Sequence, residues 1–200
     1  MGNPTVTNLL AGGAVVWYAP VAEAVPADSV AAGTAWGGNW ERFGFTKTPL
    51  SALYDFEELD MMVQEELTAV KRRKTAENMT LETTLAEVTS DYMALFTSGT
   101  ATTTAAGASQ VGKDELDVGG EFEIDEYAYG VEGTYTDASG NDFPVRVFIW
   151  KATAKLNGAL EFGKEDYPGV PLQIKALVDA SKSAGQKLFK LQRVTAAATG

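Results

Sequence analysis

The chain has 200 residues, of which 45% are hydrophobic and 22% charged, and this length and composition are typical of one folded domain rather than of a disordered chain. Its formal net charge of −11 argues against a protein that grips DNA or an anionic membrane, because such proteins usually present a basic face. The sequence contains no cysteine and no histidine, which excludes disulfides, thiol catalysis, Ser–His–Asp hydrolysis and metal sites built on those ligands.

The beginning of the chain predicts an arm, one strand and a long loop. Residues 1–13 are small and polar and are expected to form an N-terminal arm, and the apolar run at residues 14–18 predicts a short strand. Residues 21–38 are rich in Ala, Gly and Pro without periodicity, which predicts a long loop. Trp36 stands among small residues in this loop and is a candidate for a contact between subunits. Prolines and carboxylates interrupt this apolar region, so no membrane span and no membrane partner are expected.

Carboxylates gather in two segments that contain no basic residue, 50–70 and 114–132. In each segment apolar and acidic side chains alternate, which predicts half-buried strands with carboxylates on the open face. The candidates for this acidic surface are Asp55, Glu57, Asp60, Glu121, Glu123 and Asp125.

Two explanations of the acidic segments remain open at this point. Paired carboxylates can perform glycosidic acid–base chemistry or hold divalent cations, although residues 55–66 lack the central Gly of a calcium loop. Carboxylates along the open face of strands can instead form an extended negative surface, or a solvated face that keeps the protein soluble.

A basic run, Lys71, Arg72, Arg73 and Lys74, follows the first acidic segment. Because successive side chains of a strand point to opposite faces, this run does not make one nucleic-acid patch. It is either an edge strand protected by charge or a complementary contact with the acidic strand of a neighbouring subunit. The basic residues near the C-terminus invite the same interpretation: Lys182, Lys187, Lys190 and Arg193.

One short helix is expected near the middle of the chain. Residues 79–85 alternate strictly and predict a strand, and residues 89–96 then carry apolar side chains at helical spacing. Thr89 or Ser90 is expected to cap the helix, and Gly99 is placed to end it.

The stretch GASQVGKD, residues 107–114, has the G-x-x-x-x-G-K spacing of a phosphate-binding loop but carries Asp where Ser or Thr is required. It ends a Thr- and Ala-rich segment, and residues 97–112 are expected to form a flexible linker loop. A working phosphate loop stands between a hydrophobic strand and a helix, and neither pattern flanks this stretch. We therefore expect no nucleotide site, no metal and no cofactor, and we regard Lys113 as a candidate contact to a neighbour's carboxylate.

The second half of the chain predicts strands almost throughout. A turn at residues 137–141 joins two of them, and further strands are expected at 160–162, 172–179 and 188–193. About ten short strands with one short helix indicate an all-β fold, a β-sandwich or barrel with one short α-helix and long loops or arms. The domain is expected to span residues 14–193, followed by a C-terminal tail at 194–200.

The succession of these elements resembles the major tail tube proteins of long, flexible-tailed bacteriophages. The resemblance rests on a strand ending in Trp17-Tyr18, WERFGFT at residues 40–46, acidic strands, MTLETTLAE at 79–87 before the helix, and YPGVPLQIKALVD at 167–179 followed by LFKL at 188–191. It covers residues 14–193 in order, and the Thr-rich segment 97–108 matches no specific element of that family.

This resemblance implies a β-sandwich with a flanking helix, no enzymatic activity, and sixfold rings whose inner strands close a continuous barrel. The rings stack into a tube around a tape-measure protein, and long loops and arms bridge them. The implied partners are other copies of the chain, the tape-measure, tail terminator and tail tip proteins, and genomic DNA in transit without sequence-specific binding. The implied location is the virion tail, assembled in the host bacterial cytoplasm.

Within that scheme, charge assigns roles to the candidate residues. The six acidic candidates are expected to line the channel, because cationic contacts would trap DNA there. The basic run at residues 71–74, Trp36 and the arm are expected to contact neighbouring subunits. Two alternatives remain: another phage structural β-protein, such as a capsid decoration or head–tail connector protein, and a carboxylate-based hydrolase. A hydrolase requires two carboxylates facing each other in a cleft of a monomer.

Overall fold

The computed structural model describes residues 11–87, 89–137, 139–160 and 167–197. These residues form ten strands and one helix, so the predicted all-β fold class with a single short helix is confirmed. In chain order the elements are β1 (Ala11–Pro20), β2 (Glu41–Arg42), β3 (Ser51–Met61), β4 (Lys71–Leu85), α1 (Ser90–Thr97), β5 (Thr100–Thr104), β6 (Lys113–Asp117), β7 (Glu126–Thr136), β8 (Asp142–Leu156), β9 (Val170–Ala176) and β10 (Phe189–Arg193).

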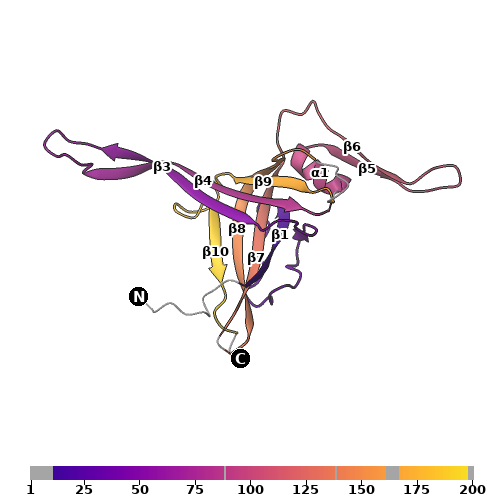
Figure 1. The fold of residues 1–200 in the computed structure, drawn as a ribbon, viewed down its shortest axis with the longest axis horizontal. Coiled ribbons are helices and arrows are strands. Elements are labelled where there is room, and N and C mark those ends of the chain that lie inside the picture. Colours follow the sequence, from indigo (N-terminus) through magenta and orange to yellow (C-terminus); the bar gives the residue numbers. More distant parts are fainter. Residues whose placement is uncertain (1–10, 88, 138, 161–166, 198–200) are drawn as a thin grey trace.

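The main sheet is antiparallel and is organised around β8. Its strands follow the order β2-β1-β7-β8-β9-β4-β3, and β10 joins it along β8. One edge of β8 holds two partners, because residues 145–149 pair with β10 and residues 152–156 pair with β9. The other edge of β8 pairs with β7. Figure 1 shows the result: β3, β4 and β9 cross above the upright strands β7, β8 and β10.

The main core lies between these two groups of strands. Leu81 of β4, Tyr129 of β7, Ile149 of β8 and Ile174 of β9 are each at most 1% exposed and belong to one apolar cluster. In β4 buried side chains alternate with less buried ones through residues 79–85, as the sequence predicts. This alternation therefore identifies the core face of β4 correctly.

A second cluster covers the other face of β1, β7 and β8. Trp17 of β1 and Phe148 of β8 pack there against Trp36 and Trp40 from the loop before β2. The rings of Trp17 and Trp36 are stacked with their centroids 5.1 Å apart, and Trp36 is only 4% exposed. The expectation that Trp36 is an anchor for a neighbouring subunit is thereby corrected, because its large apolar ring is buried within its own chain.

A buried ion pair fixes the same loop to the sheet. Arg146 of β8 is fully buried, and its Nε donates to Oε2 of Glu132, its partner on β7, at 2.7 Å. Glu132 also accepts hydrogen bonds from the backbone N–H of Gly33 (2.8 Å) and the indole N–H of Trp36 (3.1 Å). Nη2 of Arg146 donates to the carbonyl of Val30 at 2.7 Å. Charges removed from water need such partners, so the pair and the loop depend on each other.

The helix α1 begins where the sequence predicts. Thr89 is its N-cap, and its hydroxyl accepts a hydrogen bond from the backbone N–H of Tyr92 at 3.2 Å. The left-handed residue that ends the helix is Ser98, with φ 49° and ψ 39°, and not Gly99 as expected. Gly99 is required for a different reason, because a Cβ there would lie 2.7 Å from the carbonyl oxygen of Asp117 in β6.

Two hairpins leave the body in opposite directions, β3–β4 on one side and β5–β6 on the other (Figure 1). The expected linker at residues 97–112 is corrected by β5, which pairs with β6 throughout residues 100–104. Threonine favours strands, and the low complexity of the segment concealed this preference. GASQVGKD forms the turn of the hairpin, where Gly107 and Gln110 exchange backbone hydrogen bonds of 2.8 and 3.2 Å.

Two strand predictions also change. Residues 121–125 form a loop rather than a strand, and the backbone N–H of Asp125 donates to Oγ of Ser98 at 2.9 Å instead of joining a ladder. The strand expected at residues 172–179 ends at Ala176.

Some predicted segments fall outside the described residues. These are residues 1–10 of the expected arm, 161–162 of the strand expected at 160–162, and 198–200 of the expected tail, whereas residues 11–13 belong to β1. No helix in the described part of the chain is long and apolar enough to span a membrane.

Candidate assembly surfaces

Strand β3 is an exposed edge of the main sheet. It pairs with β4 on one side, and within the described residues no strand pairs with its other side. Ten of its eleven residues are exposed, including Leu53 (62%) and Leu59 (53%). The predicted half-buried strand is therefore exposed on both faces in a single chain, because the hairpin projects beyond the body (Figure 1). A long edge with apolar side chains is a template for pairing with another strand.

The pairing register distributes the acidic residues of β3 over two faces. Paired residues share a face, and successive residues alternate. Asp55 lies opposite Asn78 and Glu57 opposite Ala76, on the face turned away from the core. Asp60 lies on the other face, and its Oδ1 accepts a hydrogen bond from Nε of its partner Arg72 at 2.8 Å. The three acidic candidates of this strand thus do not form one surface.

The outward face of β4, β9 and the end of β8 continues the face that carries Asp55 and Glu57. Glu82 lies on it and accepts hydrogen bonds from the side-chain amides of Gln173 (2.6 Å) and Asn157 (3.2 Å). Sequence reasoning missed Glu82, although its alternation with the buried residues of β4 indicated an outward position. We call this surface the polar sheet face; its charged members beside the body are Asp55, Glu57, Glu82, Lys155 and Lys175, and Lys71 and Arg73 continue it towards the tip of the hairpin.

The basic run forms the first residues of β4, and Arg72 and Lys74 form ion pairs within their own hairpin. Arg72 contacts Asp60 and lies 3.8 Å from Glu58, and Nζ of Lys74 lies 3.0 Å from Oε1 of Glu77. All of these side chains are exposed, so each pair contributes little to stability. Lys71 and Arg73 lie on the opposite face from Arg72, across from Met61 and Leu59.

The remaining acidic candidates lie in the loop before β7, which we call loop 121–125. Its side chains alternate between acidic residues and two exposed apolar residues, Phe122 (101%) and Ile124 (59%). Within the described residues, Glu121, Glu123 and Asp125 form no ion pair. The structure therefore separates the six acidic candidates into three places: the polar sheet face, the opposite face of β3, and this loop.

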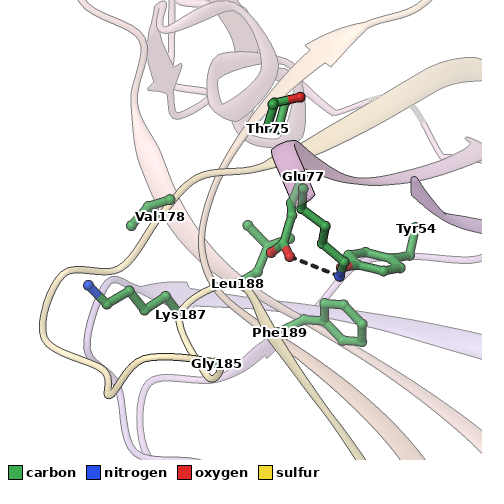
Figure 2. A pocket seen from close by; sticks show the side chains of 10 residues that line it. Tyr54, Thr75, Glu77, Val178, Gly185, Lys187, Leu188 and Phe189 are labelled. Atoms are coloured by element: carbon green, nitrogen blue, oxygen red, sulfur yellow. Dashed lines mark hydrogen bonds and ion pairs between the residues drawn. The ribbon is translucent and has the colours of Figure 1, made fainter. Parts of the chain in front are cut away.

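An open groove of about 680 Å³ lies at the base of the β3–β4 hairpin (Figure 2). Tyr54 and Lys74 line its hairpin side, and Val178, Lys187 and Phe189 line the side formed by β10 and the segment before it. Nζ of Lys74 donates to the hydroxyl of Tyr54 at 2.8 Å as well as to Glu77. These hydrogen bonds, first that of Tyr54 and then that of Glu77, raise the pKa of Lys74 above its usual range.

Two features expected of a metal site and of a phosphate-binding loop are missing from the described residues. Among the described residues there is no group of three or more His, Cys, Asp or Glu that can hold a metal ion. The last two residues of GASQVGKD belong to β6 and not to a helix, so the helix N-terminus that binds phosphate is missing there. Lys113, expected to reach a neighbour's carboxylate, lies 2.7 Å from Glu115 of its own chain.

Comparison with known families gives a match along almost the whole chain. A family model described as phage tail tube protein matches residues 1–193. Comparison with curated proteins finds no match.

Proposed function

The chain belongs to the phage tail tube protein family, and from this premise we propose that its copies form hexameric rings that stack into the hollow conduit for genome ejection. Membership makes it a structural protein of the virion tail that assembles into a tube with other tail proteins. The number six and the long, flexible tail come from the resemblance described above, in which inner strands of six copies close one barrel.

The observation that carries this proposal is the free edge of β3. A strand of eleven residues with one unpaired edge and exposed apolar side chains is a liability in a protein that stays monomeric. Pairing with a strand of the next copy satisfies its backbone N–H and C=O groups, and closing the ring leaves no edge. The β3–β4 hairpin then forms part of the wall of the tube.

The polar sheet face is the surface that we assign to the channel. It lies opposite the apolar core, and its carboxylates Asp55, Glu57 and Glu82 repel the DNA backbone. Lys155 and Lys175 share this face, as do Lys71 and Arg73 towards the tip of the hairpin, so the lining is mixed in charge rather than uniformly acidic. Such a surface lets DNA pass without firm phosphate contacts, which require clustered basic residues. Asp60 and loop 121–125 are not part of the lining in this proposal.

The contacts between copies involve residues that the single chain leaves exposed. Lys71 and Arg73 lie on the free part of the hairpin and remain candidates for contacts between subunits, as does the N-terminal arm. Arg72 and Lys74 already have acidic partners in their own hairpin. Further proposed partners are the tape-measure, tail terminator and tail tip proteins, with genomic DNA present only in transit and assembly in the host bacterial cytoplasm.

Electron microscopy of the purified protein tests this proposal. Negatively stained samples over a range of concentrations are expected to show hollow rings and stacked tubes, because closing the β3 edge requires further copies. Sedimentation velocity on the same samples measures the number of copies in the smallest closed species, for which we expect six. A protein that remains monomeric at every concentration would contradict the proposal.

A further inference from the structure

Loop 121–125 presents an apolar projection for which its own chain supplies no cover. Phe122 is fully exposed and Ile124 is 59% exposed, and the two side chains are flanked by the carboxylates of Glu121, Glu123 and Asp125. Exposed apolar groups rimmed by charge are typical of surfaces that bind another protein. The loop therefore offers a short acidic segment with apolar side chains at every second position.

The groove at the base of the β3–β4 hairpin has the complementary chemistry. Its apolar lining includes Val178, which is 62% exposed, together with Leu188 and Phe189. Lys187 lines its outer side, and Figure 2 shows its side chain extended along the segment before β10. No carboxylate occurs between residues 180 and 193, whereas four basic residues do: Lys182, Lys187, Lys190 and Arg193. The groove thus combines apolar walls with Lys187 on its outer side, and the one carboxylate in its lining, Glu77, is already paired with Lys74 at 3.0 Å.

The loop and the groove lie on opposite sides of β8. The loop leads into β7, which begins at Glu126 and pairs with one edge of β8. The groove is formed by β3, β4, β10 and the segment before β10. These strands lie on the other side of β8, because β10 pairs with its other edge and β4 and β3 are joined to that edge through β9. In Figure 1 the loop between β6 and β7 lies beside α1, and the segment before β10 lies beneath the β3–β4 hairpin. One chain therefore does not fill its own groove.

We infer that loop 121–125 of one copy docks into this groove of the next copy in the ring, with Phe122 and Ile124 against Val178, Leu188 and Phe189. Glu121 and Glu123 then approach Lys187, and this pairing of opposite charges selects the orientation. Two different surfaces on opposite sides of a subunit make a head-to-tail contact, which is the kind that closes into rings. The inference rests on the proposed ring assembly and names the contact between neighbours within it.

Crosslinking tests the contact directly, because the chain has no cysteine of its own. In the double variant Glu123→Cys/Lys187→Cys, each copy carries one thiol in the loop and one at the groove. Under mild oxidation, a denaturing gel without reductant is expected to show a ladder of covalent oligomers up to the size of the ring. Each single variant has one thiol and is expected to stop at the dimer. The matched control Asp114→Cys/Lys187→Cys places the first thiol on β6 and is expected to give no ladder.

A second variant measures the apolar part of the contact. Because Phe122 is fully exposed, Phe122→Ala is expected to leave unfolding unchanged and to raise the concentration needed for assembly by about tenfold or more. The docking contact is overturned if the double cysteine variant forms tubes without a ladder, or if Phe122→Ala assembles like the wild type. Absence of rings from the wild type itself would overturn the ring proposal, and the docking contact with it.

Discussion

At the scale of single residues, Glu132 and Arg146 form an ion pair that is almost fully buried, whereas the other ion pairs of the described residues are exposed or partly exposed. Replacing Glu132 by Gln removes the negative charge and leaves a buried guanidinium without its counter-charge. We expect this variant to lose about 3–5 kcal/mol of unfolding free energy in urea denaturation, because one partner of a buried pair is missing. The double variant Glu132→Leu/Arg146→Met removes both charges and is expected to recover most of that loss. Equal destabilisation by the single and double variants would contradict this explanation.

Gly130 gives a second prediction at this scale. A Cβ at this position would lie 2.2 Å from Cζ3 of Trp36, so the ring must move if alanine is introduced. We expect Gly130→Ala to cost about 1–3 kcal/mol through overpacking. Gly133→Ala is the matched control on the same strand, because nothing lies within 4 Å of the corresponding Cβ. Thermal unfolding of both variants measures the difference, and a control as unstable as Gly130→Ala would show that Trp36 is not the cause.

Asp179 makes the segment beside the groove sensitive to acid. The hydroxyl and then the backbone N–H of Ser181 bind its carboxylate and hold its pKa below the usual range. A carboxyl group with a lowered folded-state pKa stabilises the protein above its unfolded value of about 4, and this stabilisation is lost as the pH falls further. Asp179→Asn is therefore expected to be less stable than the wild type at pH 7, with the gap closing towards pH 3 in denaturant titrations. A gap that stays constant with pH would exclude this role.

At the scale of elements, we expect the exposed side chains of the β3–β4 hairpin to be needed for assembly and not for folding of the single chain. Leu53 and Leu59 are exposed in the single chain, so the variant Leu53→Asp/Leu59→Asp is expected to fold normally and to lose assembly. Circular dichroism and thermal unfolding check the fold, and sedimentation velocity checks assembly. Val111→Asp/Val118→Asp places the same two charges on exposed residues on either side of β6 and is the control for added charge. Tubes formed by the double variant would show that these two side chains, which share the face of Asp55 and Glu57, are not buried against another copy.

The elements that the sequence predicts well are those whose pattern reflects burial inside the chain. Strict alternation in β4 and the cap at Thr89 depend on local geometry and on the chain's own core, and both predictions are confirmed. In β3 and loop 121–125 the alternation is equally clear, but the structure shows one exposed strand and one loop. In our account their apolar side chains meet another copy, so a single chain does not bury them.

The remaining differences arise from contacts between residues far apart in the sequence. Trp36 has small neighbours along the chain, and only the fold brings it onto Trp17 and next to Glu132. The pair of Glu132 and Arg146 likewise depends on the register of β7 with β8. The separation of Asp55 from Asp60 follows from strand alternation and was accessible from the sequence, whereas their different surroundings were not.

At the scale of the whole molecule, channel charge is expected to control genome passage. Asp55→Lys/Glu57→Lys places two bases per copy on the polar sheet face, where they would hold phosphates. We expect particles with this variant to assemble and to eject DNA more slowly than the wild type in a fluorescence assay of released DNA. The control Asp114→Lys/Asp117→Lys makes the same change in net charge on β6, which we place outside the channel. Unchanged ejection by the first variant would mean that these residues do not line the channel.

The central claim, that β3 is completed by another copy and that the polar sheet face lines the channel, is tested most directly by a cryo-electron microscopy reconstruction of the assembled protein. Our account predicts a hollow tube of six-membered rings, with the free edge of β3 hydrogen-bonded to a neighbouring copy and with Asp55, Glu57 and Glu82 facing the lumen. A reconstruction in which the edge of β3 remains unpaired, or in which these carboxylates face the outside of the tube, would contradict it.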